Sequence, residues 1–278
     1  MNLSLGFSPC PNDTFIFYAL LHQKIPTGGL TFEPVIADVE ALNLKANRCL
    51  LDITKISFNA FLAVADQYVL LDSGAALGRG CGPLLISKNE CSVDELRGQT
   101  VVIPGEKTTA NFLLDFFLPF PVKKLIKRFD EIENSLLSGE ADAGVIIHEN
   151  RFTYANRGLR LIQDLGSYWE TQTGQPIPLG GIIAKRSLPP HIQIQVSDLI
   201  ARSITYAWAH PDEVLPYVRQ YAQEMNEDVM QQHINLYVNE YTADLGEFGR
   251  KAVERFFQAG REQGRVPVAN TESIFLGR

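Results

Sequence analysis

His148 occupies the position in the sequence best suited to chemistry. It follows the apolar run 143–147 and precedes Glu149, Asn150 and Arg151. A short apolar run predicts a buried strand, and ligand-binding side chains of α/β proteins gather at the carboxyl ends of strands. A neutral imidazole is the commonest general base near neutral pH. We therefore predict that His148 is the catalytic base, the alternative being a hydrogen-bonded structural histidine.

A second candidate is a helix start after a loop that contains Gly105. Residues 100–103 read as a strand, and Thr108, Thr109 and Ala110 open an apolar helix. The backbone N–H groups and the dipole of a helix N-terminus favour an anion. We predict that Thr109 and Ala110, with Thr108 as a further candidate, bind the substrate; simple N-capping is the alternative. The loop lacks the spacing of a Walker A motif, which excludes a nucleoside triphosphate.

Lys55, Ile56 and Ser57 end another predicted strand, at 51–57. Lys55 could pair with a carboxylate, and Ser57 could bind substrate through its hydroxyl and its backbone N–H. No Gly-x-Ser-x-Gly motif surrounds Ser57, which disfavours a hydrolase nucleophile. We predict that these three residues bind the substrate.

Four further side chains have two interpretations each. Asn12 and Asp13 follow the predicted strand 3–7 and either bind substrate or cap the next helix, expected from residue 14. Arg151 either binds a carboxylate through two hydrogen bonds or lies on the surface. Arg79, between two glycines, reaches a ligand or lies in an exposed turn.

No metal site is expected. No two histidines are spaced as ligands on one helix or hairpin. The four cysteines, Cys10, Cys49, Cys81 and Cys91, form no Cys-x-x-Cys pair. They are typical of small buried residues in a reducing compartment. Cys10 alone lies in a loop assigned to the site.

The elements that would position these residues occur twice. A strand, a loop and a helix cover 3–21 and again 100–118, and a helix followed by an Asp-initiated strand covers 39–57 and again 131–148. Short apolar runs that alternate with amphipathic stretches predict an α/β protein with a largely parallel sheet. The repetition predicts two similar lobes.

Two more apolar segments indicate how the lobes connect. Residues 82–88 and 179–185 are expected to be crossover strands. The first lobe would then contain 1–90 and 186–278, with 91–185 inserted as the second lobe. This is the type II periplasmic-binding-protein-like fold, in which each lobe is a mixed sheet flanked by helices and the ligand lies in the cleft between the lobes.

The chain after residue 185 reads as helices up to about Gly264, a plausible helix-ending glycine. The last helix has an apolar stripe expected to be ordinary core. Its members are Leu245, Phe248, Ala252, Val253 and Phe256.

Composition narrows the class of protein. The net charge is −7 without a block of Lys or Arg, which disfavours nucleic-acid and membrane-surface binding. No apolar run reaches the length of a transmembrane helix. The N-terminus has neither a basic region nor a long apolar region, so we expect a cytoplasmic protein. We expect a small anionic molecule as its partner; the sequence carries no signal for an oligomeric state.

Several of these segments together resemble a known family. Residues 6–15, 54–57, 74–80, 104–110 and 146–154 are similar to those of 1,4-dihydroxy-6-naphthoate synthase, of the futalosine route to menaquinone. The resemblance runs from the N-terminus through the late helices. It implies the two-lobed fold and no metal or organic cofactor. It also implies a lyase that converts cyclic dehypoxanthinyl futalosine to 1,4-dihydroxy-6-naphthoate.

The resemblance assigns roles to individual residues as well. The base histidine of the family falls on His148, and its substrate-binding segments fall on Lys55–Ser57 and on Thr109–Ala110. Two alternatives stay open. One is the sister enzyme that dehydrates chorismate on the same fold, although the His-Glu-Asn-Arg motif favours the synthase. The other is a non-catalytic receptor for a small anionic solute.

Overall fold

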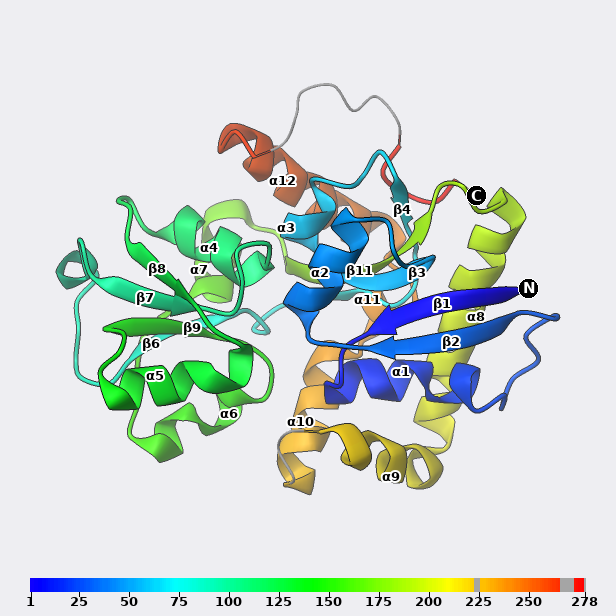
Figure 1. Cartoon of the computed structure of the whole chain (residues 1–278), viewed down its shortest axis with the longest axis horizontal. Coiled ribbons are helices and arrows are strands. Elements are labelled where there is room, and N and C mark those ends of the chain that lie inside the picture. Colours follow the sequence, from blue (N-terminus) through cyan, green and yellow to red (C-terminus); the bar gives the residue numbers. More distant parts are fainter. Residues whose placement is uncertain (223–225, 266–272, 278) are drawn as a thin grey trace. The chain divides into compact units, whose positions relative to one another are not determined.

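The protein consists of two compact units in the computed structural model, which describes residues 1–222, 226–265 and 273–277 (Figure 1). Unit 1 contains Met1–Gly78 and Pro178–Arg278, and unit 2 contains Arg79–Ile177. Each unit has a mixed β-sheet flanked by helices. The α/β class and the sheet type predicted from the sequence are therefore confirmed.

The sheet of unit 1 has six strands in the order β2-β1-β3-β11-β4, with β5 paired to β11. β1 is parallel to β2 and β3, whereas β11 is antiparallel to β3 and β4. The bounds are Asn2–Phe7 (β1), Thr31–Ile36 (β2), Ile53–Ser57 (β3), Tyr68–Leu70 (β4), Ala76–Gly78 (β5) and Ile177–Lys185 (β11).

Helices cover both faces of this sheet. α1, with α8 and α9 packed on it, lies on one face, and α2, α3 and α12 lie on the other (Figure 1). Ten of the eleven residues of α1 are buried, and its last seven, 15–21, are apolar or aromatic, as expected for a helix enclosed on every side. The bounds are Pro11–Leu21 (α1), Val39–Asn47 (α2), Phe58–Phe61 (α3), Pro190–Ala209 (α8), Pro211–Tyr221 (α9), Glu227–Tyr237 (α10), Glu240–Ala243 (α11) and Gly246–Glu262 (α12).

The sheet of unit 2 has five strands in the order β10-β6-β9-β7-β8. β7 is parallel to both of its neighbours, and β6 is antiparallel to both of its own. Helices α4 and α7 lie on one side and α5 and α6 on the other (Figure 1). The bounds are Leu84–Ser87 (β6), Thr100–Ile103 (β7), Lys123–Ile126 (β8), Ala143–Ile146 (β9), Arg160–Asp164 (β10), Thr109–Phe117 (α4), Ile132–Ser138 (α5), Asn150–Thr153 (α6) and Leu165–Thr173 (α7).

The unit boundaries differ from the predicted lobe boundaries, 90/91 and 185/186, because of strand pairing. The segment expected to cross out of the first lobe, 82–88, contains β6, which pairs with β9 and β10 inside unit 2. The segment expected to return, 179–185, lies in β11, which pairs with β3 inside unit 1. A strand belongs to the sheet that satisfies its backbone hydrogen bonds, and the apolar pattern alone did not reveal the partner.

The last long helix confirms one part of its prediction and corrects another. Leu245, Ala252, Val253 and Phe256 are buried, but Phe248 is 75% exposed. At about 100° per residue, Phe248 lies roughly a quarter-turn from the centre of the buried face. Its ring instead lies near the Lys251 ammonium, which is 5.8 Å from the ring centroid. The prediction that Phe248 belongs to the core is therefore wrong, because Phe248 lies beside the buried face of the helix and not on it.

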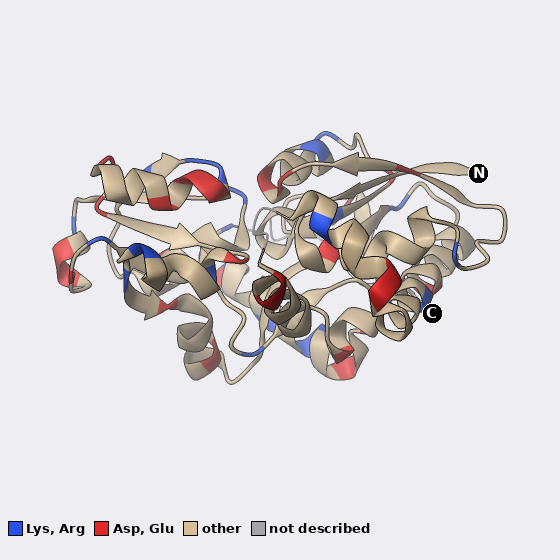
Figure 2. Ribbon diagram, turned by 90° about the horizontal axis from the view of Figure 1, so that it is seen from below, with Lys and Arg blue, Asp and Glu red and all other residues tan. Residues whose placement is uncertain are grey.

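Acidic and basic residues are interspersed along the ribbons of both units (Figure 2). Within the described ranges, no helix is long and apolar enough to cross a lipid bilayer.

Candidate active site

In unit 1 the predicted site residues gather where β1 and β3 end. These parallel neighbours pair Leu5 with Ile53 and Gly6 with Thr54, so their carboxyl ends meet at one edge of the sheet. α1 follows β1 directly. It begins at Pro11, whose ring suits the first helical position, and not at residue 14 as expected.

The early helix start changes the roles of Asn12 and Asp13. The N-cap residue of α1 is Cys10, so neither Asn12 nor Asp13 caps the helix. Both lie in the first turn and are buried. Their side chains are therefore available for other contacts, and capping, the second interpretation of these two residues, is wrong.

Asp13 and Lys55 form a buried ion pair. Lys55 Nζ lies 2.9 Å from Asp13 Oδ1, and their side chains are 8% and 1% exposed. The same oxygen accepts a hydrogen bond from Asn12 Nδ2 at 2.8 Å. Asp13 Oδ2 accepts from the Ser8 backbone N–H at 3.1 Å and from Ser8 Oγ at 2.7 Å. With four donors around it, the carboxylate has a fixed orientation and holds the ammonium at the end of β3.

Ser57 is engaged differently from the prediction. Its backbone N–H donates to Asn43 Oδ1 at 2.9 Å, so this N–H is already used and the predicted substrate contact through it is wrong. Ser57 Oγ accepts from Asn43 Nδ2 at 3.1 Å, which leaves the hydroxyl proton to be donated. Asn43 comes from α2, which contacts β3 closely. Ile56 is fully buried, so its side chain belongs to the core.

Sequence reasoning missed His233. It lies on α10, is fully buried, and its Nε2 is 2.9 Å from Asn12 Oδ1. A helical signal was present, because Met230, Ile234 and Tyr237 share one face with His233 and are buried. A histidine on an apolar helix face must satisfy its ring nitrogens inside the protein. The partner, 221 residues earlier, could not be read from the chain.

In unit 2 the predicted residues likewise follow neighbouring parallel strands. β7 pairs with β9 through Val101–Ala143 and Val102–Gly144. β7 leads into α4, and β9 leads to His148 two residues after its end at Ile146. The α4 N-terminus and His148 therefore follow the same edge of the second sheet.

Thr108 is the N-cap of α4. Its Oγ1 accepts from the Asn111 N–H at 3.2 Å and donates to the Gly105 carbonyl at 2.8 Å. The capping interpretation of Thr108 is therefore confirmed. Thr109 and Ala110 are the first two residues of the helix and are buried. Backbone N–H groups in the first turn of a helix point along the helix axis, in the direction that favours a bound anion.

His148 has a left-handed backbone, with φ of 60°. Few residues other than glycine adopt this conformation, and strained positions of this kind concentrate at functional sites. The imidazole is half-buried and meets the Phe129 ring edge to face, with centroids 5.0 Å apart and an interplanar angle of 75°. The turn and the aromatic contact together fix the ring at the end of β9.

The two arginine predictions have different outcomes. Arg151 donates from Nη1 to the Gly82 carbonyl and from Nη2 to Asp164 Oδ2 at 3.3 Å, and its side chain is 13% exposed. Arg151 is thus not the surface residue of the second interpretation, and its guanidinium ties α6 to β10. Arg79 is exposed, as the exposed-turn interpretation predicts, and its Nη1 lies 3.5 Å from Glu170 Oε2.

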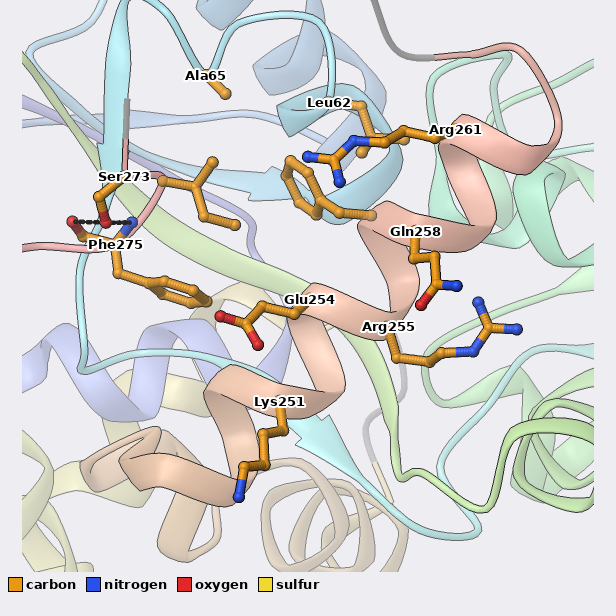
Figure 3. A pocket seen from close by; sticks show the side chains of 11 residues that line it. Leu62, Ala65, Lys251, Glu254, Arg255, Gln258, Arg261, Ser273 and Phe275 are labelled. Atoms are coloured by element: carbon orange, nitrogen blue, oxygen red, sulfur yellow. Dashed lines mark hydrogen bonds between the residues drawn. The ribbon is translucent and has the colours of Figure 1, made fainter. Parts of the chain in front are cut away.

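A surface hollow of about 570 Å³ in unit 1 contains none of the predicted residues (Figure 3). It lies between α12 and the segment 273–275, and side chains of Lys251, Glu254 and Arg255 reach its rim (Figure 3). Lys251 is already paired with Glu247 on its own helix. Arg255 likewise lies 3.5 Å from Glu262, so two of the cations at the hollow already have acidic partners, and we do not assign the site to it.

Comparison with known proteins defines the class of protein. A crystal structure of a protein from Archaeoglobus fulgidus superposes with a TM-score of 0.90 at 33% identity, covering 95% of this chain and 98% of that one. An alkanesulfonate-binding protein from Xanthomonas axonopodis bound to MOPS superposes with a TM-score of 0.72 at 15% identity, over 99% and 96% of the two chains. The protein thus has the periplasmic-binding-protein-like fold.

The family follows from the sequence matches. The profile of a family described as menaquinone biosynthesis matches residues 3–262. A 1,4-dihydroxy-6-naphthoate synthase from Thermus thermophilus is 46% identical over 94% of this chain and 95% of its own length. Its counterpart from Streptomyces coelicolor is 43% identical over 98% and 97%. The chain belongs to the menaquinone biosynthesis family, and the predicted family resemblance is confirmed.

Proposed function

We propose that this chain is a carbon–carbon lyase that converts cyclic dehypoxanthinyl futalosine to 1,4-dihydroxy-6-naphthoate, with His148 as general base. The observation that carries the proposal is the name shared by two relatives that match nearly the whole chain at 43% identity or more. The geometry of both units is compatible with this chemistry.

His148 would act at the start of the reaction. Removal of a proton activated by a neighbouring carbonyl begins an elimination or retro-aldol sequence, and formation of an aromatic ring drives it forward. Such chemistry requires a base held in one orientation and a substrate held against it. The αL backbone of His148 and its contact with Phe129 support the first requirement.

The other predicted residues would hold the substrate. The N–H groups of Thr109 and Ala110 would donate to an oxygen of the substrate, with support from the α4 dipole. In unit 1, Lys55 and the Ser57 hydroxyl would donate to another polar group. Lys55 Nζ bonds only to Asp13 within the described part of the chain, which leaves two ammonium protons for a ligand.

The test is a turnover assay on the purified chain with two substrates in parallel. Formation of 1,4-dihydroxy-6-naphthoate from cyclic dehypoxanthinyl futalosine, followed by chromatography, is the expected result. Conversion of chorismate to its enolpyruvyl benzoate product, with no activity on the first substrate, would assign the sister reaction instead. Tight binding without turnover would assign a solute receptor.

A further inference from the structure

We infer that His233 is a positioning residue that fixes the Lys55 ammonium through Asn12 and Asp13, with the imidazole proton on Nε2. The inference rests on the proposed function, which makes Lys55 a substrate contact. His233 comes from α10, far from β3 in the sequence, and it is fully buried. Its Nε2 approaches Asn12 Oδ1 to 2.9 Å.

The direction of every hydrogen bond in this chain of contacts follows from its acidic end. Asp13, ion-paired with Lys55, is a carboxylate and can only accept. Asn12 must therefore turn its Nδ2 toward Asp13, which it reaches at 2.8 Å. Its Oδ1 then faces His233, and because an amide oxygen only accepts, the imidazole nitrogen must donate. The geometry thus assigns the tautomer of His233.

The direction of these hydrogen bonds matters for Lys55, because a lysine side chain is flexible and imposes no geometry of its own. The ammonium is held by Asp13 Oδ1, the oxygen that Asn12 also contacts. Ser8 holds the other carboxylate oxygen. Without the donor on His233, the Asn12 oxygen loses its partner, and only the Nδ2 end of the amide remains held, by Asp13. The amide can then rotate about that one hydrogen bond, and the carboxylate and the ammonium would shift with it.

A purely structural histidine would contribute to stability alone, so the test must separate binding from stability. Three variants do this: His233→Leu removes the donor, His233→Gln keeps an N–H at similar reach, and Ile234→Ala damages the core beside it. Ile234 is fully buried on the same helix, belongs to the hydrophobic core of unit 1 and has no polar side-chain group with which to join the hydrogen-bond chain.

Steady-state kinetics on the proposed substrate give the first measurement. We expect His233→Leu to raise KM about fivefold, which corresponds to about 1 kcal/mol for one net hydrogen bond, while kcat changes less. His233→Gln should restore KM. Ile234→Ala should lower the melting temperature at least as much as His233→Leu and leave KM unchanged. An unchanged KM in His233→Leu, or an equal rise in Ile234→Ala, overturns the inference.

NMR of the full-length, ¹⁵N-labelled protein gives a second measurement that needs no turnover. His233 should show a proton bonded to Nε2. The Lys55 ammonium resonance, assigned from Lys55→Arg, should be sharp in the parent and in Ile234→Ala but broadened in His233→Leu. A proton on Nδ1 of His233 with none on Nε2, or a Lys55 signal indifferent to His233→Leu, overturns the inference. Because this readout is independent of the substrate, it separates failure of the inference from failure of the proposed function.

Discussion

Substitution of His148 should abolish turnover whichever residue replaces it, while stability should depend on how the replacement tolerates a left-handed backbone. We consider His148→Ala, His148→Asn and His148→Gly. Loss of a general base lowers kcat about 10²- to 10⁴-fold. All three variants lack the base, so all three should lose turnover to a similar extent, and KM should change much less.

The stability differences can be estimated from the φ of 60° and the contact with Phe129. Alanine loses an aromatic pair contact worth about 0.5–1.5 kcal/mol and keeps the backbone strain. Asparagine tolerates the left-handed region better, so it should be the more stable of the two. Glycine removes a strain of about 1 kcal/mol but gains freedom in the unfolded chain, so it should lie near asparagine.

Turnover, measured as naphthoate formation, and the free energy of unfolding, measured in urea, should therefore be uncorrelated across the three variants. Turnover in the parent should also fall at acidic pH, because a protonated imidazole cannot accept a proton. If any of the three folded variants kept turnover near that of the parent, His148 would not be the base. If turnover followed stability, its role would be structural.

Three further predictions follow from charges and burial. Lys55→Met should lower the free energy of unfolding by about 3–5 kcal/mol, because it leaves the Asp13 carboxylate buried without its partner. Urea titration measures this loss, and the double variant Lys55→Met/Asp13→Asn should recover part of it. Burial raises the pKa of the Cys81 thiol to about 12, so a disulfide reagent at pH 8 should modify Cys81 only after unfolding. Peptide mapping would locate the modified cysteine, and modification of Cys81 in the native protein would contradict the prediction. Hydrogen bonds from Lys24 and Tyr206 lower the pKa of Glu213 to about 2, below its ordinary value of 4.5. The stability that Glu213 contributes should be present above the higher value and lost as pH falls toward the lower one, so acid unfolding of Glu213→Gln should depend less steeply on pH in that window.

The sequence determined the features that depend on near neighbours. Thr108 caps a helix because its hydroxyl reaches an N–H three residues away. Gly139 ends α5 because its φ of 80° is available to glycine. The strand that leads to His148 was recognisable from its uninterrupted apolar run. Local propensity, capping and periodicity act over a few residues, so one chain read alone reveals them.

Tertiary structure decided which of these segments meet, and this altered the site. β11 pairs with β3 across more than a hundred residues, Asn43 takes the backbone N–H of Ser57, and His233 reaches Asn12. A buried donor or acceptor must find a partner wherever the fold provides one, and the many candidates in a sequence are equivalent until burial selects among them. The sequence could therefore name the chemical groups of the candidate site, but only the folded chain decided which of their hydrogen bonds were already used.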